Sequence, residues 1–181
     1  MQSAGKTVRL TRRKFVAAGA LGGAAVAIGC AAGKRGDWEF FTNDQARALA
    51  AICDRIIPAD DFPSSSQAGV ITFIDRQLSR GLRRFRDAYR DGLERAAAMS
   101  MKRFGREMAV LTAQQQDDLV RAIEQQDRAF FTLVRGHTLD GYYGSPRHGG
   151  NRDAVSWRML GLDQPIVRGR AQYNLGKGSA S

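Results

Sequence analysis

The sequence is poor in the residues that build metal and cofactor centres. It has two cysteines, Cys30 and Cys53, and two histidines, His137 and His148, in 181 residues. It contains no C-x-x-C-H motif and no cysteine–histidine cluster, which excludes a covalently attached c-type haem and a zinc site of ordinary spacing. A glycine-rich phosphate loop and a nucleophile elbow are missing as well. The sequence therefore assigns no catalytic, cofactor-binding or metal-binding residue to this chain.

Runs of alternating apolar residues are also missing, so no segment has the pattern of a half-buried strand. Apolar residues recur instead at helical spacing, and Thr42 with Gln45, and Thr112 with Gln115, have the spacing of capping boxes at helix starts. The pattern predicts an all-α fold, a compact bundle of about five or six helices. The expected helices span residues 43–57, 70–82, 83–105, 113–126, 127–137 and 154–160.

The N-terminal 30 residues have the layout of an export signal. The chain has 28 Lys+Arg against 18 Asp+Glu, a net charge of +10, and five of these cations lie in residues 1–30, which contain no acid. Arg12 and Arg13 precede Phe15 and a weakly hydrophobic run, which is too short for the roughly 20 residues that a membrane span needs. This arrangement is typical of a twin-arginine signal. Because much of the excess charge belongs to the signal, we expect no nucleic-acid partner.

Cys30 closes this segment. The tetrapeptide AIGC that ends at Cys30 resembles a lipobox, in which the cysteine thiol is acylated, and the preceding AVA tripeptide offers an ordinary peptidase cleavage site instead. Lipidation of Cys30 and plain cleavage both stay open. Cys53 falls on an apolar helix face, where a small buried thiol is expected. A disulfide from Cys53 to Cys30 or to a partner is the alternative in an oxidising compartment.

Two other polar features have ordinary structural interpretations. Asp60 and Asp61 are adjacent in the loop ADDFPSSSQAG. Because neighbouring carboxylates on a loop point in different directions, a solvated turn is favoured over a metal site or an acid–base pair. His137 lies on an aromatic helix face and is expected to be a hydrogen-bonded histidine of the core or its boundary.

The stretch GYYGSPRHGGNRDAVSW, residues 141–157, combines aromatic, cationic and glycine residues. Its Gly149-Gly150-Asn151 segment predicts a tight turn with positive φ, and Asn151 or Asp153 can cap the helix that follows. Tyrosine, tryptophan and arginine dominate protein–protein hot spots. Three interpretations stay open: a self-packed loop that holds the last helix, a docking surface for a partner subunit, and a catalytic loop. The expected docking residues are Tyr142, Tyr143, Arg147, His148, Asn151, Arg152 and Trp157.

The blocks IIPADDFPSSSQAGVITFID and GYYGSPRHGGNRDAVSWRMLGL, behind a twin-arginine signal, resemble the gluconate 2-dehydrogenase subunit 3 family over roughly residues 40–165. The resemblance implies a small, non-catalytic subunit that stabilises a FAD-dependent dehydrogenase large subunit and escorts it through export. That partner resembles glucose–methanol–choline oxidoreductases, carries the FAD and oxidises sugars, sugar acids or glycosides. A c-type cytochrome with haem c can form a third subunit.

We therefore divide the chain into a twin-arginine signal segment at 1–30, a linker at 31–39, a helical accessory-subunit domain at 40–165 and a basic tail at 166–181. The expected location is the periplasm, either free or tethered to the inner membrane through a lipid anchor or the partner. The alternative is a free-standing exported lipoprotein, or an enzyme that acts on sugar-like ligands through the His148 loop.

Overall fold

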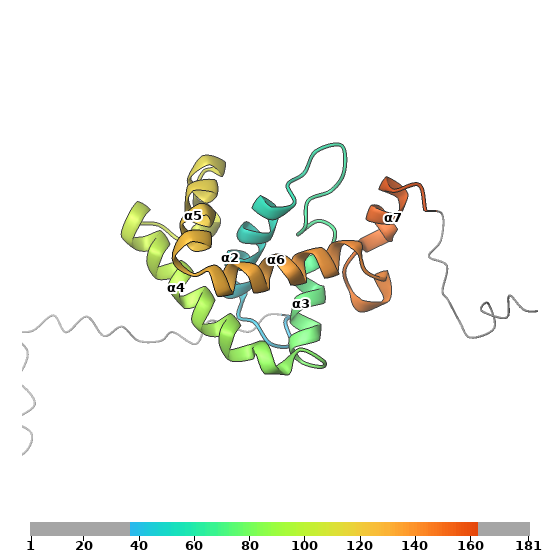
Figure 1. The fold of residues 1–181 in the computed structure, drawn as a ribbon, viewed down its shortest axis with the longest axis horizontal. Coiled ribbons are helices and arrows are strands. Elements are labelled where there is room, and N and C mark those ends of the chain that lie inside the picture. Colours follow the sequence, from blue (N-terminus) through green and yellow to red (C-terminus); the bar gives the residue numbers. More distant parts are fainter. Residues whose placement is uncertain (1–36, 163–181) are drawn as a thin grey trace, which may run out of the picture. The chain divides into compact units, whose positions relative to one another are not determined.

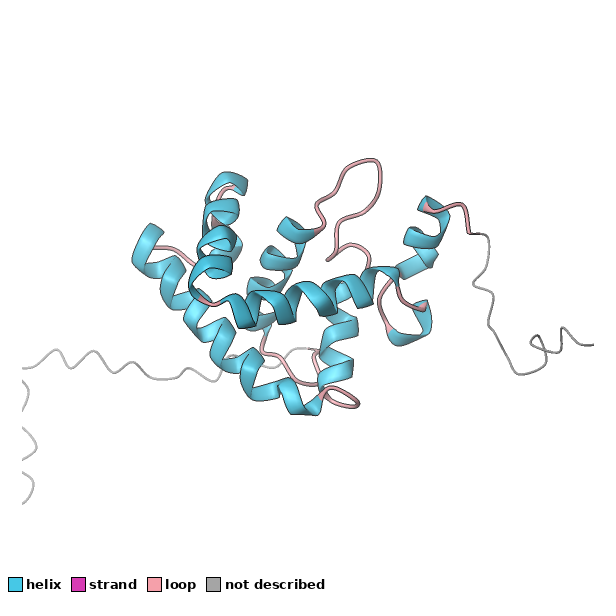
Figure 2. Ribbon diagram, in the orientation of Figure 1, coloured by secondary structure: helices cyan, strands magenta, loops and turns pink. Residues whose placement is uncertain are grey.

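The computed structural model describes residues 37–162, which form six α-helices joined by loops and short 3₁₀ turns (Figure 1). The all-α prediction is confirmed, because no strand occurs between Asp37 and Leu162 (Figure 2). Within this range no helix combines the length and apolar character that crossing a bilayer requires. The predicted signal, Cys30 and the basic tail lie outside the described residues. The helices are α2 (Asn43–Ile56), α3 (Val70–Leu78), α4 (Arg86–Phe104), α5 (Ala113–Gln126), α6 (Arg128–Tyr143) and α7 (Val155–Met159).

Both predicted capping boxes form. At the start of α2, the Thr42 hydroxyl accepts the backbone N–H of Gln45, and the Gln45 side chain accepts the backbone N–H of Thr42. Thr112 and Gln115 repeat the same pair of bonds at the start of α5. These bonds satisfy backbone donors that every helix start leaves unpaired. The local sequence therefore fixes where two of the helices begin.

Two predicted helix ends were wrong. The second helix stops at Leu78 rather than at residue 82. The helix expected to end at His137 continues to Tyr143, so the first residues of the glycine-rich stretch are helical. Gly141 lets α6 pack closely against α3, because any Cβ at this position would lie only 2.8 Å from the Phe73 ring. Close packing against α3 thus offsets the poor helix propensity of glycine.

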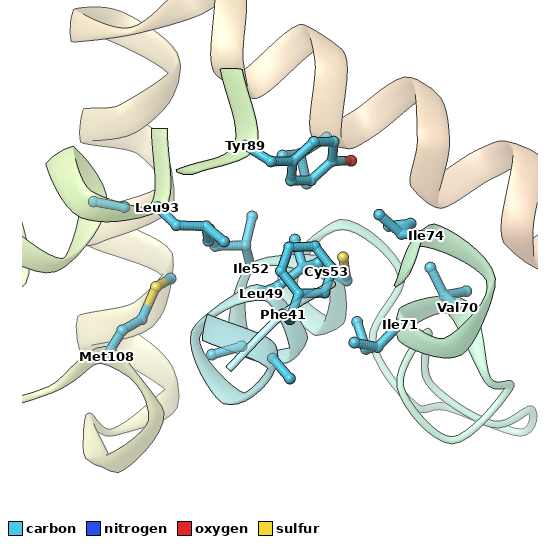
Figure 3. Packing of buried hydrophobic residues seen from close by; sticks show 14 of the residues in the cluster. Phe41, Leu49, Ile52, Cys53, Val70, Ile71, Ile74, Tyr89, Leu93 and Met108 are labelled. Carbon is cyan, nitrogen blue, oxygen red and sulfur yellow. The ribbon is translucent and has the colours of Figure 1, made fainter. Parts of the chain in front are cut away.

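The core forms around α2 (Figure 3). Leu49, Ile52 and Cys53 of α2 are fully buried, and Phe41, just before the helix, packs against Tyr89 of α4 with ring centroids 5.8 Å apart. Helix α6 packs against α2 and also against α3 and α5. Apolar burial is the main favourable term in folding, so this shared cluster holds α2 to its neighbours.

One acid on the buried face of α3 fixes the segment that leads into α2. Asp75 is 2% exposed, and its carboxylate accepts the backbone N–H groups of Glu39, Phe40 and Phe41 at 2.7, 2.9 and 3.0 Å. Hydrogen bonds to a carboxylate are roughly twice as strong as those between neutral groups, and they offset the cost of its burial. Packing against the core begins at Trp38, inside the predicted linker.

Asp75→Asn is expected to lower the free energy of unfolding by about 2 kcal/mol or more, because the amide places a donor beside buried N–H groups. Urea denaturation followed by circular dichroism measures this change. Asp91→Asn, at an exposed position of α4, is the matched control and is expected to shift stability by less than about 0.5 kcal/mol. Equal stability of the Asp75 variant and the wild type would show that the carboxylate does not anchor the segment.

Candidate functional site

The two sequence blocks that carry the family resemblance meet in the structure. The first contributes the loop after α2 and the start of α3, residues 63–72, and the second contributes the end of α6 and the loop before α7, residues 141–156. We call these two segments together the block junction. It lies at the end of α6 nearest α7 (Figure 1).

The first segment of the block junction is fastened to the end of α2. The Ser65 hydroxyl donates to the Cys53 carbonyl at 2.9 Å, and the backbone N–H and hydroxyl of Ser66 donate to the two Asp54 carboxylate oxygens at 2.7 and 2.6 Å. A serine-rich loop that looks irregular in the sequence is therefore held by hydrogen bonds to the preceding helix.

Tyr142, near the end of α6, ties the second segment to the first. Its side chain is 1% exposed, and its hydroxyl donates to the carbonyl of Pro63 at 2.8 Å. Burial raises the pKa of the Tyr142 phenol above its ordinary value, and the nearby Tyr143 and Asp60 add to this shift. The phenol therefore stays protonated near neutral pH and serves as a hydrogen-bond donor.

Glycines allow the backbones of the two segments to touch. A Cβ on Gly69 would lie 2.7 Å from the carbonyl oxygen of Gly149, across the two segments. Within the second segment, a Cβ on Gly150 would overlap the carbonyl oxygen of Gly141 at the end of α6. The backbone N–H of Arg152 donates to the Ala68 carbonyl at 2.9 Å. A side chain at Gly69 would separate the two segments, and one at Gly150 would push the loop before α7 away from the end of α6.

Asn151 holds the loop in shape from within. Its φ is 46°, in the left-handed region that asparagine tolerates better than most residues. The side chain is fully buried, donates to the Gly144 carbonyl at 2.8 Å and accepts the Ser156 N–H in the first turn of α7 at 2.9 Å. The predicted positive-φ turn is confirmed, and φ at Gly149 is 100°.

Trp157 completes the attachment of α7. Its indole N–H donates to the backbone carbonyl of Tyr143 at 3.0 Å, and the side chain is partly exposed. Together with Tyr142 and Asn151, it shows that the loop packs on its own domain and holds the last helix. This packing leaves the docking interpretation open for the outward side chains.

The seven residues expected to dock a partner therefore divide into two groups. Tyr142 and Asn151 are buried and act inside the domain. Tyr143 is 41% exposed, and Arg147 donates from Nε to Nε2 of the exposed His148 at 3.1 Å. The residues that present surface to a partner are Tyr143, Arg147, His148, Arg152 and, in part, Trp157. Their docking role stays a prediction.

His137 has the structural role that the sequence favoured. It is 8% exposed, its Nδ1 lies 3.0 Å from the Tyr89 hydroxyl, and its ring stacks on the Tyr89 ring. Burial lowers the pKa of His137, with Arg84 adding to the effect and Asp140 opposing it. The imidazole is therefore neutral at neutral pH and belongs to the packed interior.

The remaining candidate features are also structural. The Asp60 carboxylate accepts the backbone N–H of Phe62 at 2.8 Å and so closes the predicted solvated turn. Residues 37–162 contain no group of three His, Cys, Asp or Glu side chains that could hold a metal ion. Cys53 is fully buried, accepts from the Thr138 hydroxyl at 3.2 Å, and burial raises its pKa to about 12. The buried-thiol prediction is confirmed, and the Cys30 alternative lies outside the described residues.

Sequence reasoning missed two acids that organise this region, Asp54 and Asp75. The signal for Asp75 was present, because it falls on the apolar stripe of α3 that also contains Ile71 and Leu78. A charged residue on such a stripe indicates a buried carboxylate with partners. Asp54 carried no comparable signal, because its serine partner is 12 positions away across a loop.

A family model described as gluconate 2-dehydrogenase subunit 3 matches residues 43–163. The match covers more than half of the chain and includes both segments of the block junction. No curated protein and no solved structure matches the chain.

Gly150→Ala and Gly136→Ala are expected to change stability in opposite directions. The Cβ at position 150 meets the backbone of Gly141, so the loop must shift away from the end of α6, at a cost of about 1–3 kcal/mol. Gly136 lies inside α6, and no atom would lie within 4 Å of a Cβ added there, so alanine favours the helix by up to about 1 kcal/mol. Thermal unfolding of both variants measures the difference. A Gly150 variant as stable as the wild type would contradict the close approach at the block junction.

Proposed function

Because the chain belongs to the gluconate 2-dehydrogenase subunit 3 family, we propose that it is the small accessory subunit of an exported dehydrogenase complex. Its large partner in this proposal is a FAD-dependent flavoprotein of the glucose–methanol–choline type that oxidises sugars, sugar acids or glycosides. The flavoprotein carries the FAD and performs the chemistry, and this chain stabilises it and escorts it. The family match over residues 43–163 is the observation that carries the proposal.

The use of polar residues in the domain supports a structural rather than a chemical role. Tyr142, Asn151 and Asp75 use their hydrogen-bonding groups on backbone partners within the same chain. His137 bonds to Tyr89 inside the core. These side chains make a rigid body with an outward-facing loop, which is what an escort subunit needs to present a constant surface to its partner.

The sequence supports export of the complex by the twin-arginine pathway. The twin-arginine pathway transports folded cargo, so a flavoprotein that takes up FAD in the cytoplasm can leave with this chain on a single signal. In this proposal Arg12 and Arg13 direct both proteins to the periplasm. A c-type cytochrome then accepts the electrons, and Cys30, where acylated, tethers the complex to the inner membrane.

In the two competing proposals, the chain performs its function without a flavoprotein. One is an enzyme that uses His148 with Tyr143 or Arg147 on a sugar-like ligand. The other is an exported lipoprotein that binds envelope components through its basic surface. Both predict a chain that is functional when purified alone, which separates them from an escort.

The test is to express the affinity-tagged full chain in its own host and to isolate it from the periplasmic fraction. We expect an approximately equimolar flavoprotein with a flavin absorbance spectrum and dye-linked oxidation of a sugar or sugar acid. The double substitution Arg12→Lys with Arg13→Lys should leave both proteins in the cytoplasm, and Arg9→Lys, outside the pair, is the control. A chain recovered without a flavoprotein, or a flavoprotein exported normally beside the double variant, would contradict the proposal.

A further inference from the structure

A groove that shares no residue with the block junction lies between the start of α2, the helix α4 and the 3₁₀ turn Met108–Val110. Its volume is about 230 Å³. Small and apolar side chains make up much of its lining. These are Ala48, Leu93, Ala97, Met101, Met108 and Ala109.

Acids outnumber cations in the lining of this groove. Its acids are Asp44, Glu94 and Glu107. Its cation is Arg47, so three negative charges against one positive charge leave a formal charge of −2. Arg47 lies between two of the acids, 2.7 Å from Asp44 and 3.5 Å from Glu107. We call this feature the acidic groove.

Glu94 is the acid of the groove that has no cation of its own. It is exposed, and within residues 37–162 it forms no ion pair. The cations that flank it along α4 already have acid partners, because Arg90 pairs with Asp87 and Arg95 pairs with Asp127. The groove therefore presents a carboxylate that is free to meet a cation from another chain.

Apolar side chains remain in contact with water beside this carboxylate. Met101 is 52% exposed, and Val110, in the 3₁₀ turn that borders the groove, is 61% exposed. In the part of the chain that the structure describes, the other exposed large hydrophobic residues are Tyr143, Leu160 and Leu162, at the end of α6 and just after α7. Exposed apolar surface therefore occurs at two separate places, and such surface marks interaction sites.

A stable complex needs more surface than the expected docking residues of the block junction present. Specific protein–protein interfaces use roughly 20–30 residues on each partner. The expected docking side chains that reach the surface are Tyr143, Arg147, His148, Arg152 and part of Trp157. A subunit that stays bound to its partner through export therefore requires a further contact surface.

We infer that the acidic groove is a second contact with the flavoprotein and takes a cationic segment, with a basic side chain on Glu94 and an apolar side chain against Met101. This inference rests on the proposed function. Complementary charge sets the register and the association rate of an interface. The flexible methionine side chain adapts to the shape of an apolar group, which suits it to a binding surface.

The experiment measures the dissociation constant between the full chain and the flavoprotein that was isolated with it and then separated from it. Glu94→Lys reverses the charge of the unpaired acid and is expected to weaken binding about tenfold or more at low ionic strength. Met101→Ser removes the apolar contact and is expected to weaken binding about threefold or more.

Glu124→Lys, the same change at an exposed position on α5, is the matched control and should leave binding within about twofold of the wild type. Added salt should weaken binding of the wild type more than binding of the Glu94 variant, because the variant has lost the attractive charge. Melting curves check that every variant is folded.

The outcomes separate the inference from the proposed function. Weaker binding in both groove variants, with the control unchanged, supports the second contact. If the wild type binds the flavoprotein and both groove variants bind it equally well, the inference is wrong and the escort function stands. That result also covers a groove filled by one of the cationic ends of this chain. If the wild type does not bind the flavoprotein, both fail.

Discussion

The contact on which the arrangement of this region depends is the approach of two backbones at the block junction. Gly150 lies against the carbonyl of Gly141, and Gly69 lies against the carbonyl of Gly149. A side chain at Gly69 would force the loop before α7 away from the start of α3, and one at Gly150 would force it away from the end of α6. These contacts fix the loop so that the Asn151 side chain bonds to both Gly144 and the first turn of α7. They also fix the position of Arg152 near α2. The glycine contacts inside the domain therefore also determine where the exposed side chains of this loop lie.

The same contact explains how one loop can combine buried and exposed residues with different roles. Tyr142 and Asn151 point inward and bond to backbone carbonyls, which removes freedom from the loop. Arg147 and Arg152 point outward from the fixed backbone. Residues held in place before binding lose less conformational entropy when a partner arrives. For an escort subunit, this rigidity is the physical basis of a stable interface.

Local patterns in the sequence predicted the helical fold and much of its detail. The capping boxes at Thr42 and Thr112 depend on bonds across three residues and were readable directly. The end of α6 could not be predicted in this way, because the close packing of Gly141 against Phe73 of α3 joins residues far apart in the sequence. The aromatic, cationic and glycine residues of the candidate site could also be recognised from the sequence. The burial of Asn151 and the bond between the Arg152 N–H and the Ala68 carbonyl depend on contacts distant in sequence, and no local spacing encodes them.

In the proposed complex, the block junction presents the surface on which the flavoprotein docks. Hydrogen–deuterium exchange of the full chain, alone and bound to the co-isolated flavoprotein, can locate this surface. We expect the amides of residues 66–72 and 147–153 to exchange more slowly in the complex, while those on α5 keep their rates. Slower exchange confined to α4 and α5, with unchanged rates at the block junction, would contradict it.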